Sequence, residues 1–202
     1  MPKGGPVAAA RTGRPVEVDP DHVAEVALRL FAERGFDAVT MDDVAVAAGV
    51  SRRTLFRVFR TKDDLVWGGT AEAADRIAAE LAALPDRADP YEAMRTAYVA
   101  ALTFPSSLIP VTRARLRLIA DHERLSAGAV TRLGAGRDLV VGELRRRLGP
   151  DASPLLLEVR TSAIAAAVFA AMTFWARQDG GDPATVVDRA LAGLVRDWSA
   201  DD

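Results

Sequence analysis

Cysteine is absent from the chain of 202 residues, which excludes disulfide bonds and zinc sites built on thiolate ligands. Lysine is almost absent, with Lys3 and Lys62 as its two positions, so positive charge rests on arginine. A secretory signal is also lacking, because the first twenty residues contain no apolar core segment. The longest uncharged run, residues 161–176, is rich in alanine and short for a membrane span. We therefore expect a cytoplasmic protein.

Side chains that could carry out catalysis are scarce. Of the two histidines, His22 is expected to be exposed at the start of a helix. His122 is flanked by two acids, but consecutive helical positions point in different directions and cannot form one site. The segment GAGRDL at 134–139 lacks the third glycine and the preceding strand of a dinucleotide site. The sequence therefore favours a protein that is not an enzyme and that uses no metal and no cofactor.

Apolar periodicity and helix-ending residues indicate an all-α fold. Asp19 and Pro20 are typical of a helix N-cap and first position, and Gly35 is typical of a helix end. Thr40 and Thr61 each precede an aspartate by three positions, which resembles a capping box. Further helices are expected over about 62–84, 90–104, 110–148 with a break near Gly128 or Gly134, 154–178 and 183–199.

A basic segment, AAGVSRRTLFRVFRTKDDL at 47–65, follows the second predicted helix. The whole chain has 26 basic residues against 28 acidic ones, yet this segment holds five basic residues before its first acid. A glycine turn and the N-cap Ser51 introduce a short helix with arginines in its first turn. This is the geometry of the recognition helix in a helix-turn-helix motif. An isolated arginine pair would more often be a solvated surface, but this combination favours DNA binding, because guanidinium groups can recognise guanine.

Residues 21–67 resemble the DNA-binding region of the TetR family of bacterial transcriptional regulators. The stretch ALRLFAERGFDAVTMDDVAVAAGVSRRTLFRVFRTKDDL matches the family pattern over three helices and the start of the fourth. The resemblance implies a helix-turn-helix domain at 19–66 and a helical ligand-binding and dimerisation domain at 67–202. The preceding segment, 1–18, is expected to be a flexible basic arm that either reaches the minor groove or is inert; its basic residues are Lys3, Arg11 and Arg14.

The resemblance also implies which side chains contact DNA. Thr40 would donate to one phosphate and Lys62 would hold another, while the start of the third helix would lie over base edges. Phe56 stands where the family usually has tyrosine and cannot donate a hydrogen bond, so Arg57 and Arg60 would restore backbone contacts electrostatically. The predicted DNA-contacting residues are Thr40, Ser51, Arg52, Arg53, Thr54, Phe56, Arg57, Arg60 and Lys62.

The last two predicted helices, 154–178 and 183–199, resemble the family's dimer interface. Two copies would form a four-helix bundle, although an ordinary intramolecular core is the alternative. A dimer would place two recognition helices on a palindromic operator. The predicted small surface of the first of these helices consists of Val159, Ala163, Ala166, Ala167, Ala170 and Phe174.

A ligand cavity among the middle helices is a further implication of the resemblance. Arg113 and Arg117 are four positions apart and share a helix face, so they would be anion partners of a carboxylate or CoA thioester, whereas Arg115 points elsewhere. A solvated surface is the alternative for this pair. The predicted apolar lining residues are Met94, Tyr98, Phe104, Leu108, Leu116, Ile119, Phe169, Met172 and Trp175.

Taken together, these features predict a dimeric, ligand-responsive transcriptional regulator that acts as a repressor and is released from DNA by a small hydrophobic or acyl-CoA-like effector. The chain also resembles the subgroup of regulators found near mycofactocin biosynthesis clusters, whose regulatory domains are associated with acyl-CoA-like ligands. The alternative is a helical small-molecule-binding or catalytic protein in which the basic helix is incidental.

Overall fold

The computed structural model describes residues 19–199, apart from the side chains of Ala71, Val130, Ala135 and residues 195–199. Over this range the chain forms helices joined by turns, and no strand occurs within it, which confirms the all-α prediction. The predicted basic arm at 1–18 lies outside the described residues.

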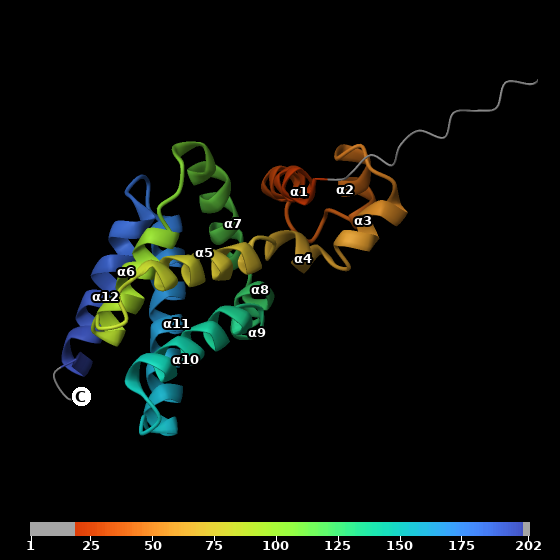
Figure 1. The fold of residues 1–202 in the computed structure, drawn as a ribbon. Helices are drawn as coiled ribbons and strands as arrows, with labels where there is room; N and C mark the ends of the chain where they lie inside the picture. The colour runs from red at the N-terminus through yellow and green to blue at the C-terminus, as the bar shows by residue number, and fades with distance from the viewer. Residues whose placement is uncertain (1–18, 200–202) are drawn as a thin grey trace, which may run out of the picture.

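The first four helices form the predicted DNA-binding unit, which lies at one end of the molecule (Figure 1). The expected caps are present, since Thr40 and Thr61 each complete a capping box and Ser51 accepts a hydrogen bond from the Thr54 amide. Gly49, in the turn before the third helix, has a φ of 66°, a left-handed conformation that favours glycine. The four helices are α1 (Pro20–Arg34), α2 (Met41–Ala47), α3 (Arg52–Val58) and α4 (Lys62–Val66).

The remaining helices, which we call the regulatory helices, pack beside this unit, and α5 leads from α4 into them (Figure 1). They are α5 (Thr70–Ala83), α6 (Pro90–Ala101), the short 3-10 helix η1 (Ser106–Leu108), α7 (Ile109–Asp121), α8 (Glu123–Ala127), α9 (Ala129–Arg132), α10 (Gly134–Leu148), α11 (Pro154–Arg177) and α12 (Pro183–Ser199).

Two of the predicted helices are divided in the structure. The segment 62–84 is broken between α4 and α5, where Gly69 has a φ of 85° and therefore cannot continue a right-handed helix. The segment 110–148 is broken near Gly128 and Gly134, as expected, and also at His122, whose backbone is extended. The additional break separates α8 from α7, and α8 and α9 then lie between α4 and α10 (Figure 1).

The hydrophobic core of the DNA-binding unit continues into the regulatory helices. Buried side chains of α1–α4 pack in one cluster with Ile119 of α7, Leu125 of α8 and Ala129 of α9. A second cluster joins α5, α6, α10, α11 and α12, and Leu116 of α7 packs against both clusters. As a result, α7 connects the DNA-binding unit mechanically to the regulatory helices.

Helix α11 is long and apolar enough, by length and composition alone, to cross a membrane. It packs against α7, α10 and α12, and core helices of soluble proteins meet the same criterion. Along its outward surface several apolar side chains nevertheless remain exposed, including Leu155, Val159 and Phe174.

Candidate DNA-binding surface and ligand cavity

The outward surface of α3 is basic. The side chains of Arg52, Arg53 and Arg57 are exposed there. Arg52 Nη1 lies 3.2 Å from Asp42 Oδ2 of α2, and its guanidinium carbon lies 5.5 Å from the centre of the Phe56 ring. Arg53 and Arg57 form no ion pair within residues 19–199, so their guanidinium groups are available to an external anion. This arrangement matches a recognition helix that meets DNA.

Three hydroxyl groups predicted to contact DNA belong to helix caps. Thr40 Oγ1 donates to Asp43 Oδ2 at 2.6 Å and accepts from the Asp43 amide at 3.1 Å. The Thr40 hydroxyl group, and after it the Thr40 amide, which donates to the same Oδ2 at 2.8 Å, hold the pKa of the Asp43 carboxyl below its usual value. Ser51 Oγ accepts from the Thr54 amide at 3.1 Å and lies 2.7 Å from Thr54 Oγ1. The structure thus assigns these residues to capping, and their contacts with DNA stay predictions.

Lys62 differs from the expectation of a phosphate contact. Its Nζ donates to the carbonyl oxygens of Phe36 at 2.7 Å and Val39 at 2.9 Å, with a longer contact of 3.4 Å to that of Asp37. It also lies 4.7 Å from the centre of the Phe36 ring. An ammonium group has three N–H donors, and all three are directed at the loop between α1 and α2. Lys62 therefore fastens α4 to that loop, and its contact with a phosphate stays a prediction.

Substitution of Lys62 by methionine should lower stability rather than weaken the electrostatic part of DNA binding. Removing the ammonium group leaves partly buried carbonyl oxygens without a donor, which should cost about 1–3 kcal/mol. Thermal unfolding would measure this loss. The matched control is Arg57→Met, which should leave stability unchanged and reduce the salt dependence of DNA binding by about one phosphate contact. A reduced salt dependence in Lys62→Met with unchanged stability would instead assign Lys62 to a phosphate contact.

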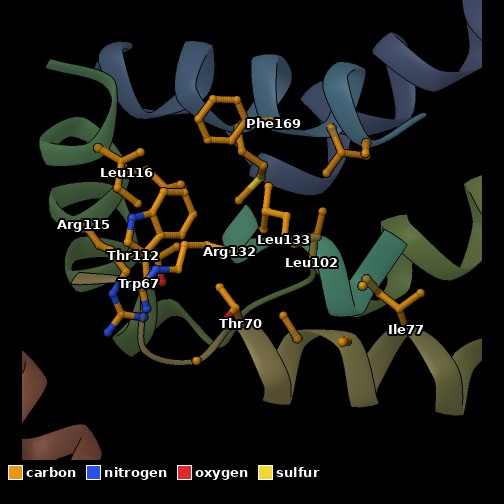
Figure 2. Close-up of a pocket in the computed structure, with 18 of the residues that line it drawn as sticks. Trp67, Thr70, Ile77, Leu102, Thr112, Arg115, Leu116, Arg132, Leu133 and Phe169 are labelled. Atoms are coloured by element: carbon orange, nitrogen blue, oxygen red, sulfur yellow. The ribbon is translucent and has the colours of Figure 1, made fainter. Parts of the chain in front are cut away.

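A cavity of about 210 Å³ lies between α5, α7 and α11 (Figure 2). Trp67, Leu116 and Phe169 lie toward one end of it and Ile77 toward the other. The rings of Trp67 and Phe169 are stacked, with centroids 6.4 Å apart. Burial raises the pKa of Tyr98 to about 12, so its hydroxyl group stays protonated. The predicted residues that do line the cavity are Tyr98, Phe104, Leu116, Ile119, Phe169 and Met172.

Three apolar residues predicted for the cavity lie elsewhere. Met94 is completely buried in the cluster formed by α5, α6 and α10–α12. Leu108, in η1, is 46% exposed at the surface. Trp175 is completely buried near the end of α11, where its indole N–H donates to the carbonyl of Gly181 at 2.8 Å. Helical periodicity identified these side chains as apolar but could not show which core they enter.

Arg113 and Arg117 do not face the cavity, and their assignment as anion partners is corrected. Arg113 donates to the carbonyl oxygens of Trp175 at 2.9 Å and Gly180 at 2.8 Å, and its guanidinium carbon lies 4.1 Å from the centre of the Trp175 ring. Arg117 donates to the carbonyl of Ala176. The last carbonyl groups of a helix lack intrahelical donors. These two arginines supply them at the C-terminal end of α11.

Sequence reasoning missed the basic side chains of the cavity wall. Arg115, set aside as pointing elsewhere, lines the cavity, and the described residues that line this cavity include no acid. Thr112, Arg115, Leu116 and Ile119 follow the spacing of a single helix face, which is the signal that could have identified it. The other arginines that line the cavity are Arg76, Arg132 and Arg137.

Arg132 connects the cavity to the DNA-binding unit. Its Nη1 donates to Asp64 Oδ1 of α4 at 2.6 Å, and Arg124 Nη2 of α8 donates to Asp63 Oδ1 at 2.9 Å. Partial burial raises the pKa of Asp64, but the hydrogen bonds from Arg132 and the Thr61 amide outweigh it and leave the pKa below its usual value. Residues of α8 and α9 thereby hold α4 from the side of the cavity.

Comparisons with known proteins agree with this architecture. The family model for bacterial regulatory proteins of the TetR family matches residues 24–66, and that for the MftR C-terminal domain matches residues 88–199. MftR of Mycobacterium tuberculosis, assigned to mycofactocin biosynthesis as a transcriptional regulator, is 30% identical over 84% of this chain and 86% of its own.

Solved structures share the fold. FadR of Bacillus halodurans, a fatty acid degradation regulator, has a TM-score of 0.64 at 18% identity, covering 88% of this chain and 98% of its own. FadR of Thermus thermophilus, a transcriptional repressor in complex with lauroyl-CoA, has a TM-score of 0.57 at 23% identity, covering 88% and 93%. Members of this family regulate transcription and are not enzymes. The chain belongs to the TetR family of bacterial transcriptional regulators and carries a C-terminal domain of the MftR type.

Proposed function

We propose that this regulator is a repressor that binds a palindromic operator as a homodimer and is released by a small hydrophobic or acyl-CoA-like effector. The observation that carries the proposal is the shared wall between cavity and DNA-binding unit. Val66 and Trp67, at the end of α4, line the cavity, and Arg132 both lines it and binds Asp64 of α4. A DNA-binding role places the protein in the cytoplasm.

Occupation of the cavity would change the position of the recognition helix through α4. A ligand can shift an equilibrium between two conformations only by its difference in affinity for them. A ligand that separates α7 from α5 would disturb the Arg132–Asp64 and Arg124–Asp63 contacts that hold α4. The conformation with these contacts intact would then be the one that binds DNA, and the liganded conformation the one that releases it.

The exposed apolar stripe of α11 supports the dimer. Leu155, Val159 and Phe174 are 70%, 52% and 58% exposed, and Ala166 and Ala170 are exposed between them. On a helix these five positions share one side, and small residues in the middle allow a second helix to approach closely. A contiguous exposed apolar surface of this kind typically marks a protein–protein interface. Pairing of α11 with its symmetry mate would cover it.

The composition of the cavity supports the effector class. Its walls are mainly apolar, with aromatic side chains such as Trp67 and Phe169, and arginines are its charged residues in the described part of the chain. Its volume is below the roughly 300–1,000 Å³ of pockets for drug-sized ligands, so an acyl chain would have to push the helices apart. The lauroyl-CoA bound to FadR of Thermus thermophilus is a precedent for such a ligand in this fold.

Selection of bound sequences from a random duplex pool tests the DNA-binding proposal. We expect an enriched palindrome whose two halves lie about one helical turn apart. Acyl-CoAs of increasing chain length would then be added to the complex with this site, and release is the expected result. Enrichment of a site without dyad symmetry would contradict the dimeric reader, and tighter binding on adding the effector would contradict a repressor released by it.

Arg53→Ala should cost about 1–3 kcal/mol at the selected operator and relax the base preference at one position in each half-site. Arg52→Ala should cost less, because Arg52 must first give up its exposed ion pair with Asp42, worth at most about 1 kcal/mol. Quantitative binding to the operator and to random DNA would measure both. Equal losses on the two DNAs would instead assign these arginines to phosphate contacts.

A further inference from the structure

Arg115 is the cavity arginine that forms no ion pair and no hydrogen bond with the described residues. Its Nε is buried and has no hydrogen-bond partner within the described residues. The other three arginines of the cavity wall each have a protein partner: Arg76 the carbonyl of Ala101, Arg132 a carboxylate of α4, and Arg137 a carboxylate of α11. Among these four guanidinium groups, that of Arg115 is thus the one left to interact with something else.

The guanidinium of Arg115 is also held in a defined place in the cavity wall. Its Nη1 would lie 3.3 Å from a Cβ atom at Gly69, so the guanidinium packs against the break between α4 and α5. Burial lowers the pKa of Arg115, but a guanidinium stays protonated in proteins. Asp21 of α1 and Glu72 of α5 are the acids that act on it, and each does so at a distance without forming an ion pair.

The two neighbouring arginines of α7 have structural roles, and their contacts differ from those of Arg115. Arg113 and Arg117, two positions to either side on α7, donate to backbone carbonyl groups of α11 and the following turn. Arg115 makes no such bond among the described residues. A buried N–H group without an acceptor is costly, and a structural arginine would have gained an acceptor for its Nε. An external anion would supply the missing hydrogen bonds.

We propose that Arg115 binds an anionic group of the effector, a carboxylate or a phosphate, while the apolar part of the same molecule occupies the cavity beside Phe169 and Met172. The planar guanidinium presents two parallel N–H donors, which fit both anions. The inference rests on the proposed function of the cavity and adds the charge of the ligand to it. The bound anion would lie against Gly69 and so contact the segment that joins α4 to α5.

Binding of decanoate and of its neutral analogue decanamide to the full-length protein tests the proposal. Calorimetry should show that decanoate binds about tenfold to a hundredfold more tightly, the usual effect of a hydrogen bond to a charged group. This preference should vanish in Arg115→Met and remain in Arg76→Met, a control that removes a partnered arginine from the same cavity. Arg115→Lys, which keeps the charge without the fork, should retain part of it.

Decanoyl-CoA distinguishes the two sources of the anion. If a phosphate of the CoA portion is bound, decanoyl-CoA should bind more tightly than decanoate and lose this advantage in Arg115→Met. If a free carboxylate is bound, decanoate should be the tighter ligand. Thermal unfolding of each variant shows that it is folded, and Arg115→Lys serves as the second variant if Arg115→Met is not.

These measurements distinguish a wrong anion site from a wrong effector class. Equal binding of decanoate and decanamide, together with decanoyl-CoA binding that Arg115→Met leaves unchanged, overturns the anion site but keeps a hydrophobic effector. A preference lost in Arg76→Met rather than Arg115→Met also overturns it. Absence of binding by all three compounds contradicts the proposed effector class and the anion site together.

Discussion

Substitution of Ala166 by glutamate should convert the dimer to monomers and reduce affinity for the operator by at least about a thousandfold, toward non-specific binding. Ala166 is exposed in the middle of the apolar stripe of α11. In a two-fold interface the substitution occurs twice, and it would bury two carboxylates that have no partner. Each monomer would keep its recognition helix but would read one half-site alone.

Analytical ultracentrifugation and operator binding together measure this effect. Ala82→Glu is the matched control, because Ala82 is an exposed helical alanine on α5, outside the stripe. It should leave both the oligomeric state and the affinity unchanged. A dimer that persists in Ala166→Glu would show that another surface joins the two copies, and the stripe would then need a different partner.

Substitution of Trp175 by alanine should destabilise the fold by about 3–5 kcal/mol, as for other large buried aromatic residues. Trp175 is completely buried, donates its indole N–H to the Gly181 carbonyl and carries the guanidinium of Arg113 on its ring. Its loss would leave a cavity and remove the support of the junction between α7 and α11. For a chain of this length the melting temperature should fall by about 6–20 °C.

A milder substitution of Trp175 distinguishes a role in the core from a role in the ligand cavity. Trp175 does not line the cavity, so a folded Trp175→Phe protein should bind the effector as the wild type does. Phe169→Ala removes a lining side chain. It should weaken effector binding clearly while lowering the melting temperature only slightly. A large loss of effector affinity in Trp175→Phe with unchanged stability would return Trp175 to the binding site.

Local signals in the sequence determined the DNA-binding unit. The capping pairs of Thr40 and Thr61, the N-cap Ser51 and the turn glycine Gly49 all act within a few residues along the chain. Interactions of this range depend little on the rest of the fold, so they can be recognised without it. The arginines of α3 belong to the same class, because their exposure follows from helix periodicity once Leu55 is placed in the core.

Contacts between distant segments decided the roles of individual cations. Lys62 meets carbonyl groups more than twenty residues away, and Arg113 and Arg117 meet the end of α11 about sixty residues away. Helix periodicity placed Arg113 and Arg117 on one face and Arg115 on another, but it could not say which face looks into the cavity. A long, flexible cationic side chain binds whichever acceptor lies within reach, and only the packing of the helices determines which acceptors those are.

The sequence by itself therefore determined the family, the all-α fold and the position of helix α3, since these follow from local spacing and from a motif confined to one stretch of chain. The tertiary structure decided that the left-handed Gly69 between α4 and α5 lies against the cavity and that Arg132 ties this cavity to α4. It also decided that Arg115, rather than its two neighbours, is left without a partner in the described chain. These features arise where α4, α5, α7 and α9 meet, and no local pattern encodes such a junction.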